Sequence, residues 1–300
     1  MHNLWPGFEF DGWRSAKLAR RGIYNVGLTE WQLLLCTIDG YRDLAAEIGR
    51  YGVGLSVHHP YISQWRGLDR RQSSQFLHPD ATVRERSHEW LDDSLQRAAE
   101  TGARFAVTHI ADANESVDFV TARGLAREAV ERMSDASERY SIEIHIEFVG
   151  YHETFHQPSD FAELIESSPR LKLCLDTGHL HRWSQIRGGD ERAAVSVLAP
   201  HVGSMHIWNI SSIEEYTELG HVPVHPSHRV EDGYADIEWI VGAVMNSNPR
   251  ASIVFEPTIR QETSEEFVAE GIAWVREFLG NWWEHKGLRQ GKFATGKYPD

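Results

Sequence analysis

The sequence predicts a single-domain α/β protein, a (β/α)8 TIM barrel with a C-terminal helical extension. Short runs rich in β-branched residues alternate with longer helical segments, which is the pattern of parallel βαβ units. Eight such runs within 300 residues favour a closed barrel over an open sheet. We therefore expect the barrel over 1–286, followed by a polar C-terminal tail over 287–300.

The predicted strands are short and mostly apolar. They cover 4–10, 23–28, 53–58, 103–110, 142–149, 171–177, 202–209 and 251–258. Helical segments fill the intervals, and several end at the glycine or proline expected just past a helix terminus. The predicted helices cover 41–52, 81–102, 116–140, 159–168, 190–200, 235–247 and 264–285.

Composition excludes several classes of protein. A hydrophobic content of 41% with 25% charged residues is typical of a soluble globular domain with a substantial core. We find neither a secretory signal nor an apolar run near the roughly 20 residues that span a membrane. The two cysteines, Cys36 and Cys174, suit a reducing compartment, so we expect a cytoplasmic protein. A net charge of −14 disfavours nucleic acid and leaves a small-molecule substrate as the expected partner.

Polar residues recur at the ends of the predicted strands. Because side chains alternate across a strand, Ile144 and Ile146 should face the helices while Glu147 faces the barrel interior. By the same alternation, the side chains of His58, Asp176 and Glu256 should also face the barrel interior. The complete inward set, one residue from each of six successive strands, is His58, His109, Glu147, Asp176, His206 and Glu256.

These residue types point to a metal. Active sites of (β/α)8 barrels lie at the C-terminal ends of the strands. Three carboxylates crowded there would repel one another unless a cation neutralised them. Carboxylates mixed with imidazoles suit Mn²⁺, Fe²⁺, Co²⁺ or Zn²⁺. A single strand-end histidine is more often structural, and His59, His78, His88 and His152 are interpreted that way.

Four motifs resemble the xylose-isomerase-like TIM barrels, which include sugar isomerases and epimerases and endonuclease IV. They are CLDTGH (174–179), HIEFVGYHE (145–153), MHIWN (205–209) and FEPT (255–258), and the resemblance runs from about residue 53 to 280. The family often forms homo-oligomers, so an oligomer is possible for this chain. In the epimerase branch, the resemblance implies one divalent metal held by Glu147, Asp176, His206 and Glu256.

The same branch implies further roles. Glu147 and Glu256 would act as base and acid on opposite faces of the substrate, and His179 would contact a substrate oxygen with Glu153 behind it. Trp208, Trp183, His58 and His109 are candidate substrate-binding residues. Ser212 stands where several ketose epimerases carry an arginine, which puts ketose handling of that type in question.

The endonuclease IV branch implies two or three metals instead. Its additional ligands would be His58, His109, His179, His225 and His228. Two functions therefore stay open: a metal-dependent isomerase, epimerase or related lyase on a polyhydroxy substrate, or a multi-metal hydrolase or iron-dependent oxidase acting on a small molecule or peptide. The first is favoured because it explains Glu147, Glu153, Asp176, His179, His206 and Glu256 together. The net charge of −14 disfavours only the form of the second that acts on nucleic acid.

Overall fold

Eight strands close into a barrel in the computed structural model of the chain, as the sequence predicts. The structure describes residues 23–27, 30–33, 41, 54–62, 64–69, 72–110, 117–258 and 264–285. The strands are β1 (Ile23–Gly27), β2 (Glu30–Leu33), β3 (Gly54–His58), β6 (Phe105–His109), β7 (Glu143–Glu147), β8 (Leu171–Asp176), β9 (Val202–Ile207) and β10 (Ser252–Phe255). Their order around the barrel is β1-β10-β9-β8-β7-β6-β3-β2.

The first two described strands depart from the expected pattern. β1 pairs antiparallel with both β2 and β10, so the expectation of purely parallel pairing is wrong there. β2 was not predicted, and it lies in the segment between the predicted strand 23–28 and the predicted helix 41–52. The remaining neighbours from β2 to β10 pair in parallel. The predicted strand 4–10, the tail 287–300 and nearly all of the predicted helix 41–52 lie outside the described residues.

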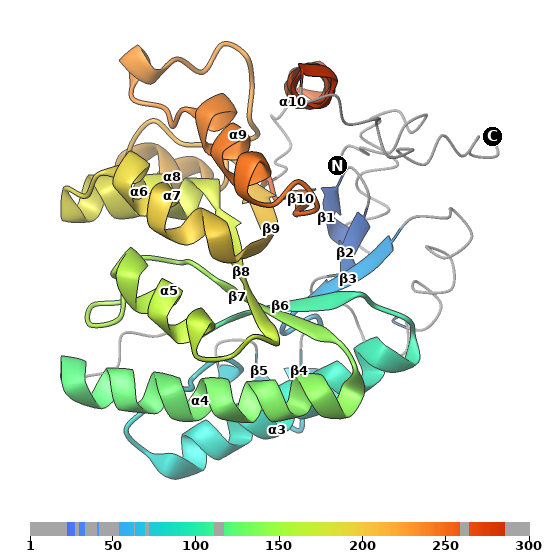
Figure 1. Ribbon diagram of the computed structural model, residues 1–300, viewed down its shortest axis with the longest axis vertical. Helices are drawn as coiled ribbons and strands as arrows, with labels where there is room; N and C mark the ends of the chain where they lie inside the picture. The colour runs from blue at the N-terminus through green and yellow to red at the C-terminus, as the bar shows by residue number, and fades with distance from the viewer. Residues whose placement is uncertain are drawn as a thin grey trace.

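The helices lie around the outside of the strands (Figure 1). They are α3 (Ala81–Glu100), α4 (Phe119–Tyr140), α5 (Pro158–Glu166), α6 (Thr177–Arg187), α7 (Glu191–Leu198), α8 (Ile213–Leu219), α9 (Ile237–Ser247) and α10 (Glu265–His285). Short 3₁₀ turns cover η2 (Ala199–His201) and η3 (Val230–Asp232), and a small hairpin pairs β4 (Gln64–Trp65) with β5 (Leu68–Asp69). None of the described helices is long and apolar enough to cross a membrane.

Aspartates begin many of these helices by accepting a backbone N–H of the first turn. Asp80, Asp118, Asp190 and Asp236 cap α3, α4, α7 and α9 in this way. Such caps stabilise a helix by roughly 0.5–2 kcal/mol each. α6 begins differently, because its cap Asp176 is also the last residue of β8. No loop separates the strand from the helix, and the sequence interpretation therefore missed α6.

The core has two layers, as the side-chain parity predicts. Leu171, Leu173 and Leu175 belong to the large cluster between sheet and helices. Inside the barrel, Phe105, Val107 and Cys174 form a separate buried cluster. His145 stacks on Phe105 with ring centres 4.2 Å apart and is 2.8 Å from the Ser204 hydroxyl through Nδ1. Side chains thus fill the barrel interior below the C-terminal ends of the strands, where the polar residues gather.

Candidate metal centre

His206 stands at the centre of a group of three carboxylates. Its Nδ1 lies 2.9 Å from Oε2 of Glu256, 3.3 Å from Oε2 of Glu147 and 3.8 Å from Oδ2 of Asp176. Ligand atoms of these four residues all lie within 4.8 Å of one another, and all four residues are buried. The structure thus brings together the four residues that the epimerase resemblance selects, from β7, β8, β9 and the end of β10.

The electrostatics of this group show a deficit of positive charge. Burial, together with the charges of Glu147 and Glu256, raises the pKa of Asp176 well above its usual range. Burial alone would lower the pKa of His206, but the surrounding anionic groups outweigh it and raise the pKa. Both shifts favour protonation, as expected for ligands that release protons when they bind a metal.

Both oxygens of Asp176 are fixed by protein donors. Oδ1 accepts the backbone N–H of His179 at 2.7 Å, and Oδ2 accepts the indole N–H of Trp208 at 2.6 Å. A carboxylate oxygen has two lone pairs, so each oxygen can still coordinate a metal. The donor set of one imidazole and three carboxylates fits Mn²⁺, Fe²⁺, Co²⁺ or Zn²⁺.

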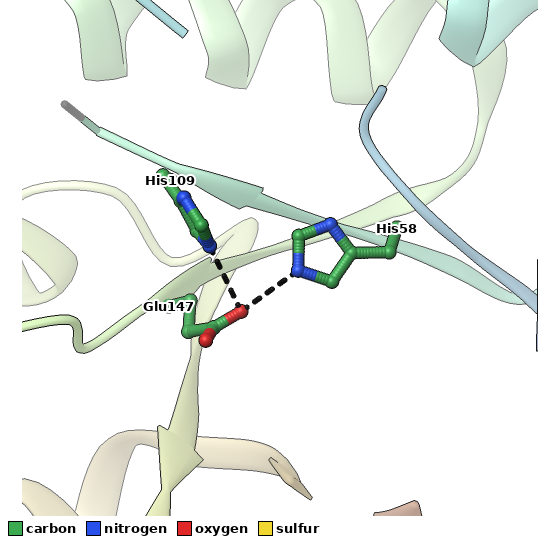
Figure 2. A group of neighbouring side chains, drawn as sticks. All are labelled: His58, His109 and Glu147. Carbon is green, nitrogen blue, oxygen red and sulfur yellow. Dashed lines mark hydrogen bonds and ion pairs between the residues drawn. The ribbon is translucent and has the colours of Figure 1, made fainter. Parts of the chain in front are cut away.

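Two more histidines contact Glu147 (Figure 2). Nε2 of His58 and Nε2 of His109 lie 3.0 and 3.3 Å from the same oxygen, Oε2 of Glu147. Nδ1 of His58 donates to the carbonyl oxygen of His59 at 3.1 Å, the kind of bond that orients metal-binding imidazoles. These three residues form a second group of potential ligands that shares Glu147 with the first.

His179 lies in the first turn of α6, over the same group. Its Nε2 is 3.6 Å from Oε1 of Glu147, and burial lowers its pKa to about 3, so the ring is neutral near pH 7. Its ring meets those of Trp208, Tyr151 and His221 edge-on, at centre distances of 5.3, 5.6 and 5.6 Å. Nδ1 is buried with no hydrogen-bond partner among the residues described, whereas Nε2 faces Glu147.

Sequence reasoning missed His221. Its ring lies flat on Trp208 at 3.9 Å, and Nδ1 donates to the carbonyl oxygen of Glu256 at 3.0 Å. His221 thereby contacts both the indole of Trp208, which hydrogen-bonds to Asp176, and the backbone of the candidate ligand Glu256. The residue lies in a loop after α8, and no strand parity could have selected it.

Other residues singled out from the sequence are covered by neighbouring side chains or lie outside the centre. Trp208 is fully buried beneath His221, so it is not a free platform for a sugar ring. Trp183 belongs to the large core cluster, packed edge-on against Phe148. Glu153 is exposed on the segment after β7. Ser212 caps α8 by accepting the N–H of Glu215.

The loop histidines are also separate from the centre. Nε2 of His225 lies 2.9 Å from Oε2 of Glu270 on α10, and its ring stacks on Phe267 at 4.0 Å. His228 stacks on Tyr234 at 4.0 Å. In the described parts of the chain, neither histidine belongs to a group of three or more potential metal ligands whose ligand atoms lie within 4.8 Å of one another. The two loop histidines that the endonuclease IV resemblance adds therefore do not join the centre.

The chain belongs to the xylose isomerase-like TIM barrel family, whose sequence model matches residues 10–278. No curated protein sequence matches it. Among solved structures, an L-ribulose 3-epimerase is 13% identical, with a TM-score of 0.67 and coverage of 97% of both chains. A D-psicose 3-epimerase studied in the presence of D-fructose is 14% identical, with a TM-score of 0.65, covering 90% of this chain and 93% of its own.

The IOLI protein with a binding zinc atom is a third similar structure. It is 14% identical, with a TM-score of 0.62, and the match covers 84% of this chain and 88% of that one. At such low identity these likenesses establish the barrel fold, and the chemistry of this chain must be argued from its own residues.

Proposed function

We propose that this protein is a divalent-metal-dependent isomerase or epimerase that moves a proton next to a carbonyl of a sugar-like polyhydroxy substrate. The observation that carries the proposal is the convergence of Glu147, Asp176, His206 and Glu256 at one point at the C-terminal end of the barrel. The sugar epimerases among its structural neighbours support the same reaction class.

These four residues would hold a divalent cation, which would supply the Lewis acidity that acidifies the C–H beside a carbonyl of the substrate. Glu147 and Glu256 come from β7 and the end of β10, which β8 and β9 separate in the barrel. Burial by itself raises the pKa of each, but positive charge on His206, and at Glu147 on His109 as well, outweighs it and lowers both pKa values. A divalent cation in place of that charge would likewise keep both carboxylates ionised and able to accept a proton.

Neutral His179 supplies the third function. Its imidazole donates a hydrogen bond without adding a charge, so it can hold a substrate oxygen beside Glu147. Asp176 does not exchange protons with substrate in this proposal, because Trp208 and the backbone of α6 fix both of its oxygens. Its role is to hold the cation.

A second function, a two-metal hydrolase or oxidase, has one observation in its favour. His58 and His109 meet Oε2 of Glu147 as two ligands of a second cation would (Figure 2). In the isomerase they are polar groups of the substrate pocket. Metal content per chain, measured after purification without chelators, separates the two functions. A value near one that persists in the double variant His58→Ala/His109→Ala supports the isomerase. A value of two that falls to one in the variant supports the alternative.

The reaction itself is tested by deuterium exchange. The metal-loaded protein is incubated in D₂O with a panel of ketoses and inososes, and deuterium next to the carbonyl is measured by NMR. Enzyme-dependent exchange in at least one compound is expected. No exchange in any of them, with the metal in place, contradicts the proton-transfer reaction.

A further inference from the structure

Arg182 lies on α6, one turn beyond His179, and is half-buried between two tyrosine rings. Its guanidinium carbon is 4.3 Å from the centre of the Tyr216 ring and 5.0 Å from that of Tyr151. Tyr216 belongs to α8, and Tyr151 follows β7. Three separate segments thus converge on one cation at the C-terminal end of the barrel.

The two tyrosines connect this cation to the metal centre. The Tyr151 ring meets that of His179 at 5.6 Å, and the Tyr216 ring lies 5.8 Å from that of Trp208. His179 faces Glu147, and Trp208 holds Asp176. Arg182 is therefore one aromatic ring away from side chains that touch the centre.

Arg182 differs from the other arginines that lie over aromatic rings. Within the part of the chain that the structure describes, each of the others also pairs with a carboxylate: Arg66, Arg123, Arg139 and Arg192. Arg182 has no such partner among those residues, and its Nε–H is buried without an acceptor. A half-buried cation without a counter-ion is costly unless a ligand supplies one.

Both tyrosine rings lie close to the guanidinium carbon of Arg182, and its N–H donors have no acceptor among the described residues. These donors form a rigid fork that matches the paired oxygens of a carboxylate or phosphate. We propose that Arg182 binds an anionic group, carboxylate or phosphate, at the end of the substrate remote from the metal. The inference rests on the proposed function, because it takes the substrate to be chelated at the metal centre.

Calorimetric titration of the Mn²⁺-loaded protein tests the inference. Three five-carbon probes differ only at one end: ribitol, ribitol 5-phosphate and ribonate. At least one anionic probe should bind about tenfold or more tightly than ribitol, and the preferred one identifies the group. Arg182→Gln should remove this preference and leave ribitol binding unchanged. The matched control Arg192→Gln, which removes a ring-stacked arginine from the outer helices, should keep it.

Each outcome is decisive. Mn²⁺-dependent binding of ribitol without any preference for the anionic probes overturns the role of Arg182 and leaves the proposed function standing. A preference that survives in Arg182→Gln shows that Arg182 only braces Tyr151 and Tyr216, which also overturns the inference. Failure of all three probes to bind in a Mn²⁺-dependent manner contradicts the proposed function, and the inference with it.

Discussion

The indole N–H of Trp208 donates to Oδ2 of Asp176 across 2.6 Å, and both residues are fully buried. Thr177 strengthens the same junction, because its hydroxyl donates to the carbonyl oxygen of Trp208 at 2.6 Å. The end of β8, the start of α6 and the end of β9 are thereby joined around one carboxylate. Asp176 is held in place before any cation binds.

Removing the indole N–H should weaken metal binding. In Trp208→Phe, Asp176 loses a fixed donor and can rotate away from His206, so the affinity for Mn²⁺ should fall by about 10- to 100-fold. Calorimetry on protein stripped of metal measures this affinity. Trp239→Phe, on α9 outside the barrel, is the control and should bind Mn²⁺ like the wild type. Unchanged affinity in Trp208→Phe would show that Trp208 does not orient the ligand.

Gly178 should be intolerant of even one methyl group. A Cβ added there would lie 2.3 Å from three ring carbons of Trp208, which is fully buried and cannot move aside. Gly178→Ala should therefore lower the free energy of unfolding by about 1–3 kcal/mol. Urea unfolding provides the measurement.

Gly124→Ala is the matched control for this variant. Gly124 is exposed on α4, and an added Cβ meets nothing within 4 Å. Alanine is the better helix former, so this change should raise the free energy of unfolding by about 0.5–1 kcal/mol. Similar effects of the two variants would contradict the close contact between Gly178 and Trp208.

The alternation of side chains along each strand explains why much of the centre could be predicted from sequence. In 171–176 the alternation of leucines with polar residues sets the direction of Asp176, and the same rule applies to Glu147. Parallel pairing then brings successive strand ends to one rim, so residues from distant segments meet without further information.

Contacts between non-neighbouring groups could not be predicted in this way. Trp208 was assigned to substrate stacking because a Trp beside a sugar site suggests it, yet its N–H bonds Asp176, 32 residues away. His221 reaches the centre from a loop, where no periodicity sets direction. β2 has only four residues and no apolar alternation that would distinguish it from a connection.

His88 should make stability depend on pH. Burial, aided by the charge of Arg132, lowers its pKa from the ordinary 6.5 to about 4. Between these values the unfolded chain binds a proton that the folded chain does not. The free energy of unfolding should therefore fall as the pH falls from 6.5 to 4, by about 3 kcal/mol at most from this residue.

The variant His88→Gln isolates this contribution, since all other groups titrate alike in both proteins. Urea unfolding at a series of pH values should show the wild type losing stability relative to His88→Gln as the pH falls through this window. A difference between the two proteins that stays constant from pH 7 to 4 would contradict a neutral buried His88.

Glu147 and Glu256 should act on opposite faces of the substrate, because they approach His206 from strands on either side of β8 and β9. Either Glu→Gln variant keeps an oxygen ligand but loses a base, so epimerisation should slow by roughly 10²- to 10⁴-fold. The remaining carboxylate can still exchange protons on its own face. In D₂O, Glu147→Gln and Glu256→Gln should therefore each label a single epimer, and these two epimers should differ. Metal content measured on the same samples separates loss of the base from loss of the cation. Labelling of the same epimer by both metal-loaded variants would show that the two glutamates do not face each other across the reacting carbon.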